Sequence, residues 1–514
     1  MALLCIFALR FSVIEEKIQD IVWHFLTSIT YSRVVCAINI YTGPFEDDPH
    51  EHEILLGRKV EPSEMRRRRD LSLKETWMKR KATRNSMTGS KFAGVYVREA
   101  YRVSNEEIRL VYLENQDNSI NLKAEVPTLG WQPVEWSCFN SSCFDILFCS
   151  MATRFGSIRL PLTAPHSPYL HLTTELNDEF TVVPVKDVRL HAPHSYLHTL
   201  GVCLQPIFFF TDWTIVIQFF ESWLAQGASK FYFYLHSYTW QTKKVLDFYK
   251  QSLGDDLELI DWSDLPVHSR DRGIYEKDPN SRVFRHGATA FMHDCMLRAR
   301  STVKFIANTD LDDLPVSSNL NISKILNLVS KRHPRAAQFK ADWILSHQPV
   351  VHFDMHSVYR NEPVDETHQH TTIEMFDNAN LYFLHLRRFE RHLLNPPVVE
   401  YNNSFDHSLL MKLNTKMLDQ FLKRIEATQF GETSLSPWAL EARQTIRDLE
   451  QCRREAFGTT LDDVNEMCQQ SSAGCEGMLG AGIHFLKAPQ TWVNVAHKAF
   501  FNSYVERSKR FTLF

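Results

Sequence analysis

The segment 303–313 constrains the fold of this 514-residue chain more strongly than any other part of its sequence. A short apolar run over 303–309 is followed at once by the carboxylates Asp310, Asp312 and Asp313. A buried strand that ends in Asp-x-Asp carries hard oxygen ligands at its carboxyl end, where open α/β sheets bind their ligands. Neighbouring carboxylates repel one another unless a cation lies between them, and such ligands suit Mg²⁺ or Mn²⁺. An acidic turn without a ligand is the alternative, because acidic turns are common after strands.

Helical and strand-like patterns alternate around this segment. Apolar residues recur at helical spacing over 213–224, 245–253, 288–296 and 322–329. Runs rich in strand-forming residues cover 231–235, 257–260, 337–339 and 343–345. The alternation predicts an α/β fold with a mostly parallel sheet, in which the acidic triplet follows about the third strand. The polar segment 261–286 interrupts the pattern, and we expect it to form an irregular loop over the active site.

The patterns divide the chain into four regions. Residues 1–90 read as a hydrophobic N-terminal stub and a polar stem, and 91–195 alternate in the manner of a β-rich accessory domain. We expect the α/β domain over 196–430 and a helical C-terminal extension over 431–514. The net charge of −4 gives no reason to expect a nucleic-acid partner.

Several motifs, taken in order, resemble those of glycosyltransferase family 92, and in particular its nematode-type members, formerly grouped as a domain of unknown function. The motifs are Val202–Pro206, Asp212-Trp213, Phe220-Glu221, Gln226–Ala228, Phe231–Tyr234, Lys244–Leu246 with Tyr249, Glu258–Trp262, His293–Cys295 and Thr309–Asp313. The resemblance covers about residues 95–430. It implies a GT-A-like, Rossmann-like catalytic domain, a UDP-sugar donor, and Mn²⁺ or Mg²⁺ as cofactor. It further implies transfer of a hexose, with galactose as the precedent, to a glycan or glycoprotein acceptor.

Sugar transfer requires that the charge developing on the diphosphate leaving group be neutralised, usually by a metal ion. We expect Asp312 to contact the metal directly, Asp310 to hold the metal or the donor ribose, and Asp313 to support either. The alternative for Asp313 is a helix-capping or surface carboxylate. His385 ends the apolar run 381–384 and is the candidate third metal ligand. The alternatives for that ligand are His352, His356, His368 and His370.

The basic pair Arg387 and Arg388 follows His385, and we expect it to clamp the donor diphosphate. An inverting enzyme also needs a base to take the proton of the acceptor hydroxyl. Glu374 and Asp377, which lie between the acidic triplet and His385, are the candidate catalytic bases. The sequence does not distinguish inversion from retention.

Ten cysteines occur in the chain, and their spacing is not that of a zinc site. The groups 138/143/149 and 452/468/475 suit local disulfides in an oxidising compartment, whereas free buried thiols are the alternative. The family resemblance implies a membrane protein of the secretory pathway that faces the Golgi lumen. The apolar stretch Met1–Ile14 is too short to cross a bilayer, so the N-terminus is atypical for such a protein.

Two other functions fit parts of the sequence. A phosphohydrolase of the haloacid-dehalogenase kind also uses Asp-x-Asp after a strand, but it needs the motif on its first strand and Thr or Val where this chain has Leu314. A non-catalytic sugar-binding relative would keep the fold and the acidic residues while lacking a base.

Overall fold

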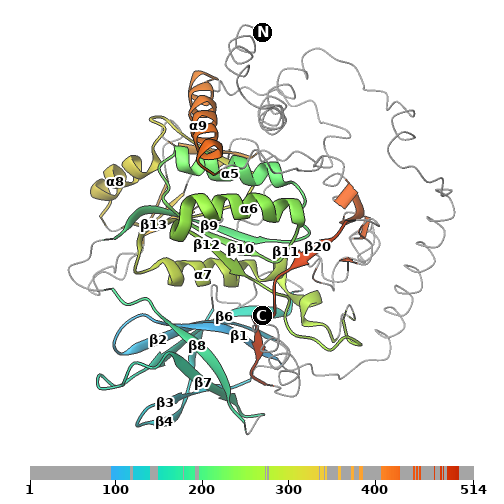
Figure 1. The fold of residues 1–514 in the computed structure, drawn as a ribbon. Coiled ribbons are helices and arrows are strands. Elements are labelled where there is room, and N and C mark those ends of the chain that lie inside the picture. Colours follow the sequence, from blue (N-terminus) through green and yellow to red (C-terminus); the bar gives the residue numbers. More distant parts are fainter. Residues whose placement is uncertain are drawn as a thin grey trace, which may run out of the picture.

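The structure is a computed structural model, and its described part begins at residue 94. The described residues are 94–115, 120–138, 149–176, 179–190, 196–272, 274, 277–334, 336–340, 342–343, 357–360, 372–375, 381–385, 407–428, 444–445, 447–449, 451–452, 468, 475–476, 479 and 483–496. Two large sheets lie one above the other with a helix between them, and further helices cover the outer face of the upper sheet (Figure 1). None of the helices in this described part is long and apolar enough to cross a membrane.

The upper sheet has seven strands and is built around a parallel core. The parallel strands are β9 (His198–Ile207), β10 (Lys230–Leu235), β12 (Leu257–Asp261) and β13 (Val303–Thr309). The strands β17 (Ser357–Arg360), β15 (Ala336–Lys340) and β18 (Thr372–Met375) extend it beyond β13, giving the order β12-β10-β9-β13-β17-β15-β18. The α/β prediction is thereby confirmed at the level of mixed sheets with a parallel core.

The acidic triplet follows the fourth parallel strand in chain order, not the third. β9 is not recognisable as a strand from the sequence, because Gly201 and the Gln205-Pro206 pair interrupt its apolar pattern. A Cβ at Gly201 would lie 2.9 Å from Cδ1 of Ile306 on β13. A larger residue at this position would therefore force the side chain of Ile306 to shift, whereas glycine leaves it room.

Helices cover both faces of the parallel core. α5 (Trp213–Ala225) and α6 (Trp240–Leu253) cover the outer face, α9 (His407–Thr428) packs on these two helices, and α7 (Ala288–Ala299) covers the inner face (Figure 1). Asp212 begins α5, because its Oδ1 accepts the backbone N–H of Thr214 at 3.1 Å. α8 (Ile322–Arg332) begins in the same way, where Oδ1 of Asn321 accepts the N–H of Lys324 at 3.0 Å.

Aromatic side chains fill the space between α5, α6 and the parallel strands. Phe220 of α5 stacks on Tyr249 of α6 with ring centroids 4.3 Å apart and on Phe233 of β10 at 5.6 Å. All three rings are buried, and burying an aromatic or large aliphatic side chain contributes about 1.5–3 kcal/mol. The helical spacing in 213–224 therefore reflects packing of this helix on the sheet.

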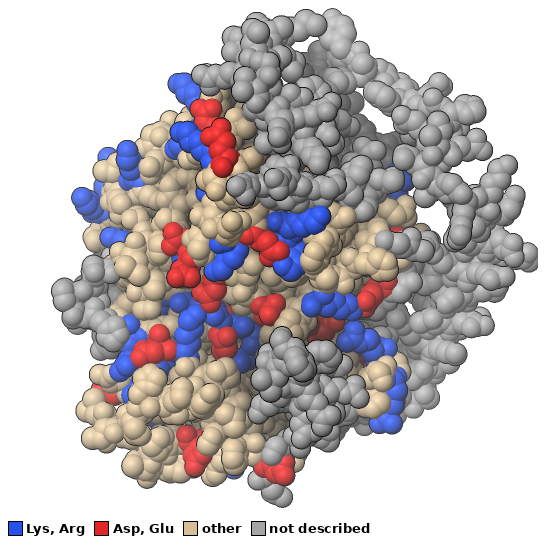
Figure 2. Space-filling view, viewed as in Figure 1, with Lys and Arg blue, Asp and Glu red and all other residues tan. Residues whose placement is uncertain are grey.

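The lower sheet confirms the β-rich N-terminal region. Its strands are β1 (Val95–Arg102), β2 (Glu107–Asn115), β3 (Leu122–Val126), β4 (Gly130–Pro133), β5 (Glu135–Ser137), β6 (Met151–Arg159), β7 (Tyr169–Thr174) and β8 (Thr181–Asp187). Their order is β4-β3-β7-β8-β1-β2-β6-β5, and most neighbouring pairs are antiparallel. Acidic and basic side chains are interspersed over the face of the molecule in Figure 2, so that face presents no large surface of one charge sign.

The described part of the C-terminal region differs from the expected helical extension. Besides short helical stretches it contains β20 (Phe485–Lys487) and β21 (Val493–Asn494), which pair with β11 (Ser237–Thr239) and β1. Both strands pair with elements that lie far away in the sequence. Their pairing depends on long-range contacts, to which the local periodicity of the sequence is insensitive.

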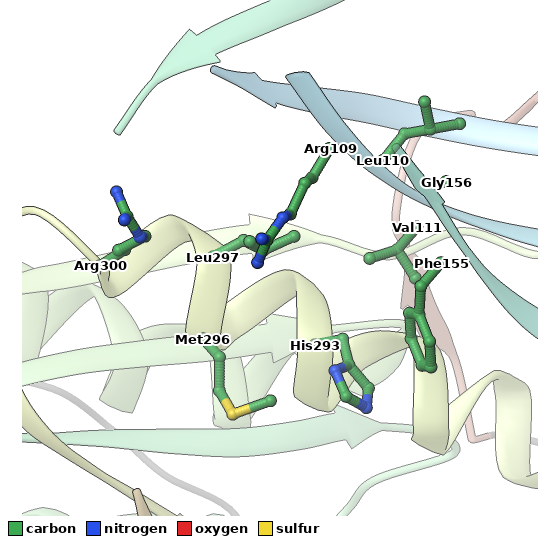
Figure 3. A pocket seen from close by; sticks show the side chains of 9 residues that line it. All are labelled: Arg109, Leu110, Val111, Phe155, Gly156, His293, Met296, Leu297 and Arg300. Carbon is green, nitrogen blue, oxygen red and sulfur yellow. The ribbon is translucent and has the colours of Figure 1, made fainter. Parts of the chain in front are cut away.

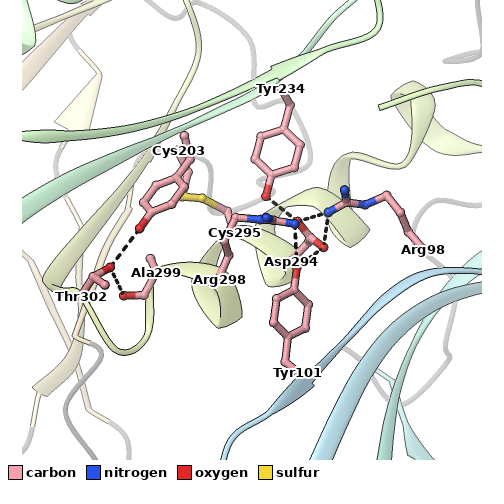
Figure 4. Close-up of a disulfide and its surroundings, with 10 residues drawn as sticks. Arg98, Tyr101, Cys203, Tyr234, Asp294, Cys295, Arg298, Ala299 and Thr302 are labelled. Carbon is pink, nitrogen blue, oxygen red and sulfur yellow. Dashed lines mark hydrogen bonds and ion pairs between the residues drawn. A yellow bond between two sulfur atoms is a disulfide. The ribbon is translucent and has the colours of Figure 1, made fainter. Parts of the chain in front are cut away.

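Asp294 of α7 joins the two sheets through a buried hydrogen-bonded cluster (Figure 4). Its carboxylate accepts two hydrogen bonds from Nη2 of Arg98, both at 2.7 Å, and one from the hydroxyl of Tyr101 at 2.6 Å. A fourth hydrogen bond comes from the hydroxyl of Tyr234 on β10 at 2.5 Å. Burial alone would raise the pKa of Asp294, but the charges of Arg98 and Arg298 hold it well below its ordinary value. The carboxylate is therefore ionised and is shared by β1, β10 and α7.

Three disulfides tie the described segments together. Cys203 of β9 is bonded to Cys295 of α7, next to Asp294. The other two are Cys149–Cys468 and Cys452–Cys475. The local disulfide expected within the group 452/468/475 is present as Cys452–Cys475, whereas Cys149–Cys468 joins the two groups. The alternative of free thiols is wrong for these four cysteines. The Cys203–Cys295 bond closes a sequence separation of 92 residues and attaches α7 to the parallel core.

The substitution Asp294→Asn tests the role of this buried carboxylate. Removing its charge breaks the buried ion pair with Arg98, whose remaining contact with Glu99 is longer at 3.4 Å, so we expect the free energy of unfolding to fall by about 3–5 kcal/mol. Chemical denaturation measures this change. Asp247→Asn, which removes an ion pair with Lys243 on the exposed surface of α6, is the matched control and should cost less than about 1 kcal/mol. Equal losses in the two variants would contradict a special role for Asp294.

Candidate active site

The carboxyl ends of β9 and β13 lie side by side at the point where the order of strand addition reverses. From β9 the chain proceeds outward to β10 and β12, and it then returns through α7 to β13 on the opposite side of β9. The order β12-β10-β9-β13 therefore creates a topological switch point between β9 and β13. Open α/β sheets bind their ligands in the crevice outside the strand ends at such a point. The acidic triplet lies directly at this edge, because β13 ends at Thr309.

The triplet forms a tight connection between β13 and β14 (Asp313–Ser317), which we call the acid turn (Asp310–Asp313). The backbone N–H of Asp313 donates to the carbonyl oxygen of Asp310 at 3.4 Å. In return, the N–H of Asp310 donates to Oδ2 of Asp313 at 3.2 Å. Asp310 and Asp313 are buried, whereas Asp312 is half-buried. Asp313 thus uses one carboxylate oxygen to close the turn that presents the other two carboxylates.

Gln205 of β9 connects the acid turn to the neighbouring strand across the switch point. Its Nε2 donates a hydrogen bond to Oδ1 of Asp310 at 2.6 Å. β9 and β13 are parallel neighbours, with Leu204 opposite Thr309, so Gln205 and Asp310 both lie at the carboxyl edge. The amide fixes the orientation of this carboxylate, as residues behind a metal ligand commonly do. No functional role for Gln205 was predicted from the sequence, because the Gln205-Pro206 pair interrupts the apolar pattern of the strand that carries it.

The register of a small sheet brings His385 to the acid turn. β19 (Leu381–His385) is antiparallel to β14, and His385 lies directly opposite Asp313. Directly opposed residues in an antiparallel pair have Cβ atoms about 4.5–5.5 Å apart. The backbone therefore brings the position of the expected third ligand beside Asp313, the last residue of the acid turn. Two carboxylates and an imidazole form a donor set that suits Mn²⁺, and the carboxylates alone suit Mg²⁺.

The other predicted site residues are not brought to this turn by the described structure. Glu374 lies in β18 opposite Phe339, three strand positions from β13 and therefore roughly 14 Å from it at the usual strand spacing. Asp377, Arg387 and Arg388 lie outside the described residues. The same holds for the alternative ligands His352, His356, His368 and His370.

The next two parallel strands also end near titratable side chains. His236 directly follows β10, and Asp264 follows β12, with Nε2 of His236 2.8 Å from Oδ1 of Asp264. Burial alone would raise the pKa of Asp264, but the hydrogen bond with His236 and the charges of His286 and Arg272 hold it well below its ordinary value. Sequence reasoning singled out neither residue, because their proximity depends on the order of the strands.

A cavity of about 280 Å³ lies away from this edge, between α7 and the lower sheet (Figure 3). Arg109, Arg300, His293 and Phe155 line it, and both arginines have partners. Arg109 pairs with Glu107 at 2.8 Å, and Arg300 donates to the carbonyl oxygens of Val103 and Val188. The cavity lies between α7 and the lower sheet and not at the carboxyl edge of the parallel strands, and its arginines already have structural roles. We therefore assign the candidate active site to the acid turn.

His293, which lines this cavity, should make the stability of the fold depend on pH. Burial lowers its pKa from 6.5 to about 4, so the native state keeps the ring neutral while the unfolded chain takes up a proton below about pH 6.5. This contribution to stability is complete above pH 6.5 and is lost as the pH falls toward 4. Between pH 7 and pH 5 the loss amounts to about 2 kcal/mol.

Urea denaturation of the wild type and of His293→Gln at these two pH values measures that contribution. The variant lacks the ionisable ring, so its stability should decline less on acidification than that of the wild type, by about 2 kcal/mol. All other titrating groups contribute to both proteins alike. Parallel declines would show that His293 is not the group responsible.

The fold and the acid turn define an α/β protein with a candidate ligand site at a topological switch point. Residues 198–444 match the family model of glycosyltransferase family 92. The chain therefore carries a family 92 glycosyltransferase domain, as the sequence motifs predicted, and that domain includes the parallel core, the acid turn and His385.

Other comparisons add little to this identification. Comparison with curated proteins found no match. Among solved structures, a crystal structure of amylomaltase from Corynebacterium glutamicum is similar with a TM-score of 0.13 and 16% sequence identity. The similarity covers 27% of this chain and 20% of that chain, and at such a TM-score it carries no argument.

Proposed function

We propose that this glycosyltransferase moves a hexosyl group, most readily galactosyl, from a UDP-sugar to a glycan or glycoprotein acceptor, with Mn²⁺ or Mg²⁺ at the acid turn. One observation carries the proposal. Asp310 and Asp312 lie at the switch point between β9 and β13, the position at which open α/β sheets bind ligands. The family 92 match supports sugar transfer as the reaction at that position.

Each residue of the acid turn has a distinct part in this proposal. Asp312, which is half-buried, would contact the metal directly, and Asp310, oriented by Gln205, would hold the metal or the donor ribose. His385 would complete the protein ligands from β19. The bound metal would neutralise the charge that develops on the UDP leaving group. Asp313 holds the turn closed, so that the two ligand carboxylates are positioned before the donor binds.

The remaining steps fall on residues whose side chains lie outside the described structure. Arg387 and Arg388 follow β19 in the chain and would clamp the donor diphosphate. Glu374 and Asp377 stay the proposed bases for the acceptor hydroxyl. β18, which carries Glu374, is separated from β13 by β17 and β15. Glu374 could therefore act as the base only if the acceptor lies across these two strands.

The three disulfides support a location in an oxidising compartment. We propose that the protein works in the lumen of the secretory pathway, with the Golgi as the compartment and the membrane as its site of attachment. Glycan acceptors pass through that compartment, which agrees with the proposed reaction.

Donor hydrolysis across a panel of nucleotide sugars, with and without Mn²⁺, tests the proposal. We expect release of UDP from one hexose donor, dependent on Mn²⁺, and a loss of at least a hundredfold in Asp312→Asn, because removing one charged ligand weakens both metal binding and leaving-group stabilisation. Asp261→Asn, an exposed carboxylate at the end of β12, is the matched control and should keep wild-type activity.

The same assay separates the alternatives. Release of inorganic phosphate from a simple phosphate ester, without sugar transfer, would indicate a phosphohydrolase instead. Thermal stabilisation by UDP and Mn²⁺ without turnover of any donor would identify a sugar-binding relative. Unchanged metal-dependent UDP binding in Asp312→Asn would show that the acid turn is not the metal site.

A further inference from the structure

Two histidines and one aspartate from three separate segments converge at the carboxyl edge of β10 and β12. They are His236, Asp264 and His286, and one nitrogen or oxygen atom of each lies within 4.8 Å of the corresponding atoms of the other two. Oδ1 of Asp264 is 2.8 Å from Nε2 of His236 and 3.8 Å from Nδ1 of His286. The two imidazole rings are 4.3 Å apart. One carboxylate oxygen therefore faces two ring nitrogens.

The ring of His236 is oriented by the side chain of Ser237, the first residue of β11. Its Nδ1 lies 3.0 Å from Oγ of Ser237, and that hydroxyl accepts the backbone N–H of Phe209 at 2.7 Å. The ring is buried, with a side-chain exposure of 4%. A partner on Nδ1 leaves Nε2 to face the cluster, and metal-binding histidines are typically oriented in this way by a second hydrogen bond.

His286 reaches the cluster through an unusual stretch of backbone. Arg285, His286 and Gly287 all have positive φ, at 40°, 55° and 88°. Two consecutive non-glycine residues in this region cost about 1–3 kcal/mol each, and such strain concentrates at functional positions. The conformation is held by Nε1–H of Trp262, which donates to the carbonyl oxygen of His286 at 2.7 Å.

The space beside the cluster is small. Asp264 and His286 line a cavity of about 10 Å³, together with residues of β2, the segment after β12, and Trp492. A cavity of this size holds about one water molecule. It cannot admit a sugar ring or a nucleotide, so a substrate site is excluded there. An ion with one bound water has the size that fits.

A plain ion pair explains the arrangement less well. One histidine suffices to pair with Asp264, yet two imidazoles face the same carboxylate oxygen, with their ring centroids 4.3 Å apart. Arg272 already balances the charge of the carboxylate, with Nη1 3.6 Å from Oδ2. A dication between the two rings and Oδ1 would use both ring nitrogens as ligands.

We propose that Nε2 of His236, Oδ1 of Asp264 and Nδ1 of His286 form a site for Zn²⁺ or a similar transition-metal dication, separate from the acid turn. Two imidazoles and a carboxylate are a donor set that zinc prefers over Mg²⁺ or Ca²⁺. In a tetrahedral site with bonds of about 2.0–2.1 Å, ligand atoms lie about 3.4 Å apart, and the observed 2.8 and 3.8 Å lie on either side of that value. The fourth position would face the small cavity and hold water.

Such an ion would clamp three segments of the sheet edge together. His236 follows β10, Asp264 follows β12, and His286 precedes α7, the helix that carries Asp294 and Cys295. The ion would thus fix the course of the segment 262–287 along the edge next to the switch point. Its binding does not require that the acid turn hold Mn²⁺ or that the protein transfer a sugar.

Zinc titration of the metal-free, full-length protein tests the site by isothermal calorimetry with a competing chelator. We expect one tightly bound Zn²⁺, and an affinity at least tenfold lower in Asp264→Asn and in His286→Asn. Asparagine is chosen at position 286 because it tolerates positive φ. Asp261→Asn is the matched control, since it removes a carboxylate from the same strand end outside the cluster, and it should bind zinc as the wild type does.

The outcome also separates this site from the acid turn. Asp312→Asn should retain wild-type zinc affinity, whatever its effect on UDP and Mn²⁺. Zinc should raise the melting temperature of the wild type and of the control, and should raise it less in the two ligand variants. Absence of tight zinc binding by the wild type would overturn the proposal, as would wild-type affinity in both His286→Asn and Asp264→Asn, or loss of the zinc site in Asp312→Asn.

Discussion

The buried carboxylate of Asp294 is the interaction on which the relation between the two sheets depends. It draws hydrogen bonds from β1 of the lower sheet and from β10 of the upper sheet, while it is carried by the helix between them. Arg298, one turn further along α7, extends the cluster to Glu99 and Glu258. A charge that is buried away from water is tolerated only when its partners are in place, so the sheets and α7 must come together in one arrangement.

That arrangement fixes the edge at which the proposed chemistry occurs. The Cys203–Cys295 disulfide attaches the same helix to β9, the strand on one side of the switch point. β9 in turn supplies Gln205, which holds Asp310 at the end of β13. A chain of covalent and hydrogen-bonded contacts therefore leads from the junction of the sheets to the acid turn. The candidate active site is thus placed by the rigid parallel core, while the turn itself contributes the ligands.

Local pattern was sufficient for part of this structure. The apolar run 303–309 ends in carboxylates and forms β13 followed by the acid turn, and the helical spacing around it corresponds to α5, α6, α7 and α8. β9 was not predicted because Gly201 and the Gln205-Pro206 pair interrupt its apolar pattern, although Gly201 also leaves room for the side chain of Ile306 on β13. The strand register brings His385 opposite Asp313, so the expected histidine ligand lies at the end of the acid turn, as the metal hypothesis predicts.

The local sequence pattern does not predict features that depend on contacts between distant segments. The pairing of Cys203 with Cys295, the addition of β20 and β21 to earlier strands, and the meeting of His236, Asp264 and His286 all follow from strand order.

Anomalous diffraction from crystals grown with Mn²⁺ and UDP tests most directly the claim that the acid turn binds the metal. A manganese peak bounded by carboxylate oxygens of Asp310 and Asp312, with the UDP diphosphate beside it, is the expected result. A peak elsewhere, with the acid turn facing only water, would contradict it.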